Sequence, residues 1–168
     1  MVAYLALGSN LGDRRAAIAH AIQSLVKVGQ VVAVSALYAT DPEGGADQPE
    51  YLNAVARLET ALPAQALLQA CLTIERNLGR VRPAGAGKSP RTIDIDLILY
   101  GDAVIEEPGL SVPHPALLVR PFVRIPLAEV ALPGLRHPVT GESLSAYPPD
   151  PTVRGLDQVA SSPAGGSS

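Results

Sequence analysis

Cysteine, tryptophan and phenylalanine are scarce in this sequence. Its 168 residues include one cysteine, no tryptophan and one phenylalanine, and aromatic residues make up only 4%. A single cysteine, Cys71, excludes a disulfide framework, so we expect a core held by packing alone and a reducing compartment, the cytoplasm.

Charge is also sparse, at 17% of residues against 47% hydrophobic ones, which excludes a disordered chain. The uncharged stretches are broken by proline and glycine, and none is long enough to span a bilayer. The first ten residues, MVAYLALGSN, lack the basic head and cleavage site of a secretory signal. We therefore expect a soluble monomer that does not bind membranes.

The net charge of −3 gives no general attraction to nucleic acid, and we expect no nucleic-acid partner. Positive charge is instead concentrated locally. The stretch 80–91 carries Arg80, Arg82, Lys88 and Arg91 and no acidic residue. This cluster has the size and charge to hold phosphate groups.

The length fits one domain of ordinary size. We expect a folded domain over residues 1–147. The stretch 148–168 is rich in proline, glycine and serine and ends in SSPAGGSS, so we expect it to be a flexible tail.

Hydrophobic periodicity predicts an alternation of strands and helices. Asn10 is a candidate cap for the first helix, and Gly79 is a candidate end for the second. The predicted order of strand, helix, strand, strand, helix, strand favours an α+β sandwich of the ferredoxin-like type, an antiparallel sheet with helices on one face. Small proline-rich additions follow it. The expected strands cover residues 2–7, 31–38, 51–60 and 93–100, and the expected helices lie between Asn10 and Gly29 and between Pro63 and Gly79.

Asp94 and Asp96 are two residues apart on the last of these strands, so both carboxylates project from one face. At about 5 Å and an effective dielectric near 20 they repel by roughly 3 kcal/mol. A divalent cation bound by oxygen ligands relieves this repulsion. A site with only two carboxylates favours Mg²⁺, which keeps several of its waters. The alternative is an ordinary solvated strand face. Arg91 lies just upstream, which favours a site for metal-bound polyphosphate.

A flat ligand is indicated by a second group of residues. Tyr51 and Asn53 share a strand face, where an aromatic ring can stack on a heterocycle and an amide can match its hydrogen-bonding edge. Phe122 either provides a second ring or packs in the core. His114, between two prolines, fits a ligand contact on a loop better than a core position.

Taken together, these residues lie in segments that resemble the 6-hydroxymethyl-7,8-dihydropterin pyrophosphokinase family of folate biosynthesis, from about residue 3 to 132. The segments are AYLALGSNLGD at 3–13, LYATDP at 37–42, DQPEYLNAVARLET at 47–60, IERNLGRVR at 74–82, PRTIDIDLILYG at 90–101 and VPHPALLVRPFVRIPL at 112–127. The resemblance implies a ferredoxin-like fold and transfer of pyrophosphate from ATP to the hydroxymethyl oxygen of the pterin, with release of AMP.

The resemblance also implies roles for individual residues. Asp94 and Asp96 would bind two Mg²⁺ ions that bridge ATP and the attacking hydroxyl, and Arg82 would lie on a loop that closes over ATP. The residues implied to contact ATP are Arg80, Arg91, His114 and Arg120. Those implied to contact the pterin are Thr40, Asp41, Tyr51, Asn53 and Phe122.

Two other readings stay open from the residues alone. A ferredoxin-like binding module without catalysis would need the sheet but not the acidic pair, the arginine cluster and the Tyr51–Asn53 face together. A magnesium-dependent nucleotidyltransferase would use similar groups but release pyrophosphate instead of AMP.

Overall fold

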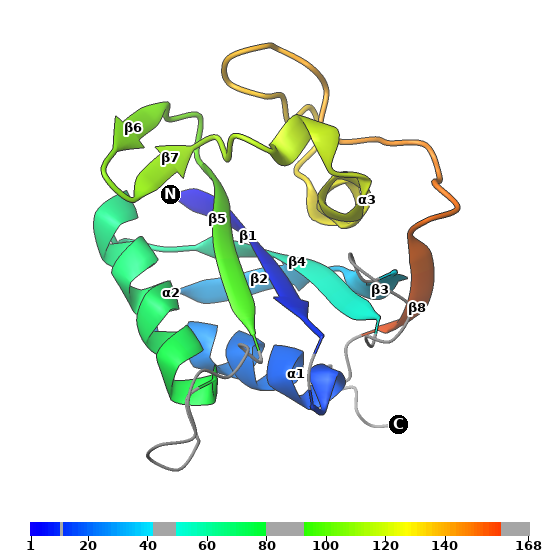
Figure 1. The fold of residues 1–168 in the computed structure, drawn as a ribbon. Coiled ribbons are helices and arrows are strands. Elements are labelled where there is room, and N and C mark those ends of the chain that lie inside the picture. Colours follow the sequence, from blue (N-terminus) through cyan, green and yellow to red (C-terminus); the bar gives the residue numbers. More distant parts are fainter. Residues whose placement is uncertain (11, 42–49, 80–92, 159–168) are drawn as a thin grey trace.

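The computed structural model describes residues 1–10, 12–41, 50–79 and 93–158, and its central element is an antiparallel sheet (Figure 1). The sheet strands are β1 (Val2–Ser9), β2 (Gln30–Val34), β3 (Ala36–Thr40), β4 (Tyr51–Glu59), β5 (Asp94–Tyr100) and β8 (Arg154–Gln158). The helices are α1 (Arg14–Leu25), α2 (Ala64–Gly79), the short 3₁₀ helix η1 (Leu117–Val119) and α3 (Pro121–Val130). A separate hairpin consists of β6 (Ile105–Glu107) and β7 (Leu110–Val112).

Strand order in the sheet is β5-β1-β4-β3-β8, and β2 also pairs with β4. Taking β2 and β3 as the two halves of one strand, the strands other than β8 follow the order of a ferredoxin-like sandwich, with the first strand between the fourth and the third. The predicted fold class is therefore confirmed. β1 lies at the centre because it pairs antiparallel with β4 on one side and with β5 on the other.

Ser35 divides the predicted strand 31–38 into β2 and β3. Its backbone N donates to the Val55 carbonyl, and its hydroxyl both accepts from the Val55 N and donates to the Ala36 carbonyl. One side-chain oxygen thus replaces a backbone acceptor in the ladder. Because Ser35 is fully buried, these bonds hold the break without exposing a polar group to an apolar environment.

Apolar residues cover both faces of the sheet. One core lies between the sheet and helices α1 and α2, and includes Leu52, Ala54 and Ala56 of β4, as the alternation in that strand predicts. A second core lies on the opposite face under α3 and includes Val55. Thus α1 and α2 share one face, as expected, and α3 is an addition on the other (Figure 1). Every helix in the described part of the chain is too short or too polar to cross a membrane.

Two local predictions need correction. Helix α1 is capped by Asp13 rather than Asn10, because the Asp13 side chain accepts from the Ala16 N at 3.1 Å. In the strand expected over 93–100, alternation predicts that Ile93, Ile95, Leu97 and Leu99 share one face, but it stops after Leu97. Leu5 pairs with Leu97 whereas Tyr4 pairs with Leu99, so β5 has a bulge there. The bulge adds one residue to β5 and moves Leu99 into the core under α3.

Part of the expected tail belongs to the sheet. Strand β8 pairs antiparallel with β3, with Ala39 opposite Arg154 and Tyr38 opposite Gly155. Val153, just before it, is 8% exposed. Composition failed to indicate this strand because its sequence, RGLDQ, is polar and pairs through its backbone along a sheet edge. The last part of the expected tail, 159–168, lies outside the described residues.

The role of β8 in stability is testable by truncation. A chain that ends after residue 152 lacks the β3–β8 ladder and the buried Val153. We expect its free energy of unfolding to be about 2 kcal/mol lower than that of the full chain, which corresponds to about 4–8 °C in Tm. A chain that ends after residue 158 is the control and should melt like the full chain. Differential scanning calorimetry measures both, and equal Tm values for the two truncations would show that β8 does not stabilise the domain.

Candidate active site

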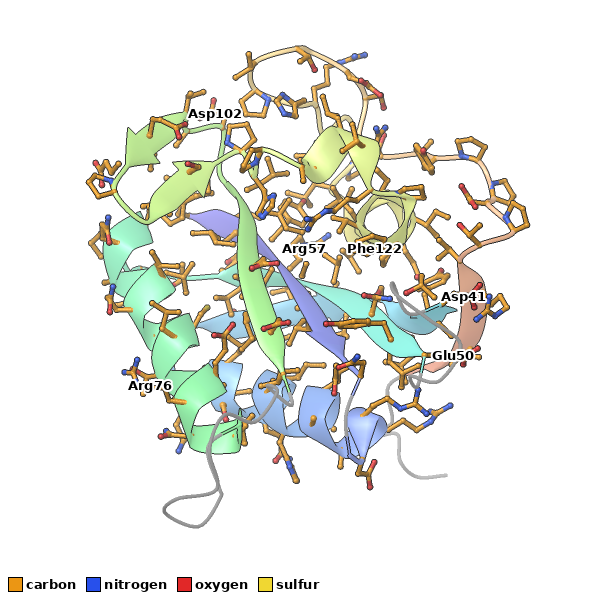
Figure 2. The ribbon with its side chains drawn as sticks, in the orientation of Figure 1. Asp41, Glu50, Arg57, Arg76, Asp102 and Phe122 are labelled. Atoms are coloured by element: carbon orange, nitrogen blue, oxygen red, sulfur yellow. The ribbon has the colours of Figure 1, made fainter. Side chains whose placement is uncertain are left out.

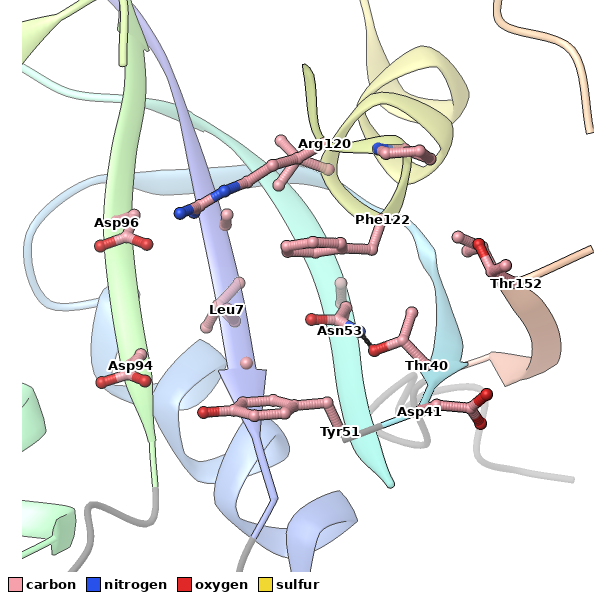
Figure 3. A pocket seen from close by; sticks show the side chains of 16 residues that line it. Leu7, Thr40, Asp41, Tyr51, Asn53, Asp94, Asp96, Arg120, Phe122 and Thr152 are labelled. Carbon is pink, nitrogen blue, oxygen red and sulfur yellow. Dashed lines mark hydrogen bonds between the residues drawn. The ribbon is translucent and has the colours of Figure 1, made fainter. Parts of the chain in front are cut away.

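A pocket of about 460 Å³ lies on the face of the sheet that α3 covers, and Figure 3 shows it from close by. Residues of β1, β3, β4 and β5 line it from the sheet, and the start of α3 and the stretch before β8 close it from above and from the side. Its lining is Ala6, Leu7, Gly8, Thr40, Asp41, Tyr51, Asn53, Ala54, Asp94, Asp96, Arg120, Pro121, Phe122, Val123, Thr152 and Val153.

The floor of the pocket follows from the strand register. Gly8 of β1 pairs with Asn53 on one side and with Asp94 on the other, and Ala6 pairs with Asp96. The functional side chains on β4 and β5 are therefore separated by β1, which presents only Gly8 and Ala6 between them on this face. A Cβ on Gly8 would lie 3.5 Å from the Asn53 Oδ1, an ordinary contact, so the glycine is needed for open space rather than for the fold.

Asp94 and Asp96 both point into one end of the pocket, as their spacing predicts (Figure 3). Asp96 is exposed and Asp94 is half-buried. Among the residues that the structure describes, no group of three or more His, Cys, Asp or Glu side chains surrounds a common point. Two carboxylates beside open space suit a hard cation that completes its coordination with water and ligand oxygens.

Glu75 of α2 supports the acidic pair from the other side of the sheet. It is 8% exposed, and its Oε2 accepts from the backbone N of Ile95 at 2.6 Å. Ile95 lies between the two aspartates on β5, so this bond fixes the strand at the place from which both carboxylates project. A charged hydrogen bond to a buried carboxylate is among the stronger ones in proteins.

The opposite side of the pocket holds the aromatic pair. The rings of Tyr51 and Phe122 face each other across the Asn53 side chain (Figure 3). Asn53 is 7% exposed, and its amide nitrogen donates to the Thr40 Oγ1 at 3.2 Å and, at 3.4 Å, to the Tyr38 carbonyl. These bonds turn the amide oxygen away from β3. The gap between the rings thus suits a flat heterocycle whose edge meets a fixed amide.

Positive charge comes from Arg120, which precedes α3. Its guanidinium lies 5.6 Å from the centre of the Phe122 ring and reaches toward Asp96 (Figure 3). His114 lies beside both, in a small second cavity that Asp96 and Arg120 also line. The His114 Nδ1 accepts from the Ala116 N at 3.0 Å. Burial lowers the pKa of His114, Asp96 opposes that shift, and Arg120 adds to it.

The structure brings most of the predicted residues together. Thr40, Asp41, Tyr51, Asn53, Asp94, Asp96, Arg120 and Phe122 all line the pocket, and His114 adjoins it. Phe122 is thus a pocket residue, although it also packs against the core under α3. Three predicted residues, Arg80, Arg82 and Arg91, lie outside the described residues.

Several residues of the site were not predicted from the sequence. Glu75 carries a signal in the sequence, because it is an acidic residue next to Ile74 in the apolar stripe of α2. Gly8 lies just beyond the strand expected over residues 2–7, whereas in the structure it belongs to β1. Thr152 and Val153 had no signal at all, since they lie in the stretch expected to be a tail.

Fold and site together define a ferredoxin-like α+β domain that can hold a flat ligand between two rings, beside paired carboxylates. The model of the 7,8-dihydro-6-hydroxymethylpterin-pyrophosphokinase (HPPK) family matches residues 4–132. The chain belongs to this family.

Curated relatives have similar sequences. The 2-amino-4-hydroxy-6-hydroxymethyldihydropteridine pyrophosphokinase of Pseudomonas aeruginosa is 45% identical over 137 residues, which is 80% of this chain and 83% of that protein. The enzyme of the same name from Methylorubrum extorquens is 46% identical over 131 residues, 77% of this chain and 82% of that protein. The folic acid synthesis protein fol1 of Schizosaccharomyces pombe is 42% identical over 145 residues, 85% of this chain but only 19% of that protein.

Solved structures show the same fold. The crystal structure of wild-type HPPK-DHPS from Plasmodium falciparum superimposes with a TM-score of 0.65 at 15% identity, over 85% of this chain and 43% of that one. The chain thus spans less than half of that protein and about a fifth of fol1. At this identity the superposition shows the fold alone.

Proposed function

We propose that this protein transfers the pyrophosphoryl group of ATP to the hydroxymethyl oxygen of 6-hydroxymethyl-7,8-dihydropterin and releases AMP, a step of folate biosynthesis. One observation carries the proposal: a ring-binding gap with a fixed amide and a pair of carboxylates share one pocket, in a chain of the pyrophosphokinase family. A binding module without catalysis would have no use for the two carboxylates beside the ring.

The geometry of the pocket supports one direction for the pterin in this proposal. Its ring lies between Tyr51 and Phe122, and its amide edge meets Asn53. Thr40 and Asp41 offer further backbone contacts at that edge. The hydroxymethyl group then points along the sheet toward Asp94 and Asp96, because these lie at the other end of the pocket (Figure 3).

Asp94 and Asp96 would hold two Mg²⁺ ions in this proposal. The donor set fits, since two carboxylates beside open space leave room for water and phosphate oxygens. When bound, the ions neutralise phosphate charge and lower the pKa of the attacking hydroxyl. The residues of the chain supply alignment, since phosphoryl-type transfer depends mainly on in-line positioning and electrostatic stabilisation.

In the reaction, the hydroxymethyl oxygen forms a bond to the β-phosphorus of ATP. The bond from that phosphorus to the oxygen it shares with the α-phosphate breaks, so AMP leaves, and the hydroxyl proton passes to solvent. Arg120 and His114 contact the ATP phosphates from the side of α3. We further assign Arg80, Arg82 and Arg91 to the ATP phosphates because of their positive charge; all three lie outside the described residues.

We also infer that the protein works as a monomer in the cytoplasm. Its one cysteine is free and buried, as in proteins of a reducing compartment.

The product of the reaction tests the proposal. Incubation of the protein with ATP, Mg²⁺ and 6-hydroxymethyl-7,8-dihydropterin should yield AMP in amounts equal to the pterin consumed, measured by ion-exchange chromatography. Release of pyrophosphate would instead indicate a nucleotidyltransferase. No turnover at all would indicate a binding module.

The acidic pair should be essential for turnover. We expect Asp94→Asn and Asp96→Asn each to lower kcat/KM at least about a thousandfold, or about 4 kcal/mol, because charge neutralisation acts mainly in the transition state. Asp102→Asn is a matched control, since Asp102 is exposed in the turn after β5 (Figure 2). Activity within a few-fold of wild type for both site variants would contradict the metal assignment.

Ring stacking and edge recognition should be separable. Phe122→Ala removes one ring of the pair. We expect the pterin to bind less tightly by about 0.5–1.5 kcal/mol beyond the effect of the smaller buried apolar area. Asn53→Ala leaves polar groups of the pterin unpaired at about 1–3 kcal/mol. Calorimetric titration with a non-hydrolysable ATP analogue present measures both. Phe122→Tyr keeps the ring and should be mild; unchanged pterin affinity in both alanine variants would locate the ring elsewhere.

The empty floor of the pocket gives a sharper test. Gly8→Ala should leave the Tm unchanged or slightly higher, because the new methyl group makes only ordinary contacts and the unfolded chain loses freedom. Pterin affinity should nevertheless fall about tenfold, because the methyl group occupies the floor between Asn53 and Asp94. Gln23→Ala, on the exposed face of α1, is the control for the binding assay, because α1 covers the face of the sheet opposite the pocket. Full pterin binding by Gly8→Ala would show that the ligand does not approach β1.

A further inference from the structure

Two residues of the pocket come from a part of the chain beyond the family match. That match ends at residue 132, whereas Thr152 and Val153 line the pocket just before β8. Val153 is buried, and its N donates to the Asp150 carbonyl at 2.9 Å. The Thr152 N and hydroxyl both bond to the Asp150 carboxylate, at 2.8 and 2.6 Å. A tight turn thus presents these two residues to the pocket.

Arg154, the first residue of β8, links two strands of the pocket. Its Nη2 donates to the Asp41 Oδ1 at 3.2 Å and to the Glu50 Oε2 at 2.6 Å. Asp41 directly follows β3 and Glu50 directly precedes β4. Figure 2 shows both acids on the side of the sheet where β8 lies. The Glu50 carbonyl also accepts from the Arg14 Nη1 at 2.6 Å, which ties the same residue to the start of α1.

The linked acids are direct neighbours of the ring-binding residues. Thr40 and Tyr51 form the last pair of the β3–β4 ladder, next to Asp41 and Glu50. Thr40 accepts from the Asn53 amide, and Tyr51 supplies one ring. Without Arg154, the carboxylates of Asp41 and Glu50 would lose the guanidinium that bridges them at the end of this ladder. Their repulsion would act directly on the Thr40–Tyr51 pair.

We propose that β8 and the turn before it position the pterin pocket. Thr152 and Val153 close the end of the pocket remote from the acidic pair. Arg154 holds the ends of β3 and β4 together, and this keeps the ring-binding residues Thr40, Tyr51 and Asn53 in place. The proposal rests on the proposed function, because it assigns the pterin to this pocket. It makes Arg154 a positioning residue, and the part of the substrate it serves is the end of the heterocycle remote from the hydroxymethyl group.

Steady-state kinetics of the full chain test the proposal. We expect Arg154→Ala to raise the KM for the pterin about two- to fivefold, the effect of an exposed ion pair, with the KM for ATP and kcat changed less than about twofold. The control is Arg136→Ala, since Arg136 is exposed and donates to the Gly141 carbonyl away from the pocket. Because the link is electrostatic, salt at about 0.5 M should reduce the difference between Arg154→Ala and wild type.

A second substitution separates positioning from a general loss of stability. In a Glu50→Gln background only Asp41 remains charged, so Arg154→Ala should raise the pterin KM less than it does in the wild-type protein. A merely structural role would give the same increase in both backgrounds. If Arg154→Ala does not fold, Arg154→Lys keeps the charge but not the two-pronged guanidinium, and we expect a smaller effect in the same direction.

Two results would overturn the proposal. One is a pterin KM in Arg154→Ala equal to that of Arg136→Ala, and the other is an equal increase of the KM for ATP and for the pterin. In either case the wild-type protein would still form AMP from ATP and pterin, so the proposed function would stand. If the wild-type protein forms no AMP, the proposed function fails, and this inference fails with it.

Discussion

The antiparallel pairing of β1 with two partners is the constraint on which the site depends. β1 carries no functional side chain in the pocket, but its register decides which residues of β4 and β5 lie level with one another. Gly8 sets Asn53 opposite Asp94, with a gap between them that no side chain fills. A slip of one residue would turn the carboxylates and the amide toward the apolar core under α1 and α2. That core therefore protects the register, since Leu5 and Leu7 of β1 and Leu52 and Ala54 of β4 are buried in it.

The charges around the pocket are arranged by element. Acidic groups on β5 lie at one end, and Arg120 enters from α3 above them. Glu75, below β5, is used for structure, because its carboxylate is occupied by the backbone of Ile95. At the other end Arg154 stands between two acids. Each end of the pocket thus combines charges of both signs, while the middle, between the rings, holds the uncharged Asn53 amide and suits a neutral heterocycle.

Much of the fold and most of the candidate site could be predicted from the sequence, because both follow from periods of two and of 3.6 residues. Alternation in 51–60 and in 93–97 set the faces of β4 and β5, and with them Tyr51, Asn53, Asp94 and Asp96. The prediction failed where the backbone departs from its period. The bulge in β5 and the break at Ser35 depend on pairing with other strands, which no local pattern records. β8 could not be predicted because this edge strand has a polar sequence with no apolar face of its own. It forms only by pairing with β3, which lies far away in the chain: Ala39 and its partner Arg154 are 115 residues apart.

The position of β8 in the chain also orders the events of synthesis. During synthesis β1, β3, β4 and β5 are made before β8. These strands carry Asn53, whose amide lies between the two rings, and the acidic pair. Residues 152–154 follow only after α3 and the long connection behind it, and the pairing of β3 with β8 closes one of the longest loops in the domain. Contacts between residues far apart in the chain form slowly. Until β8 pairs with it, the outer edge of β3 lacks the strand that covers it in the sheet order, and the pocket lacks Thr152 and Val153.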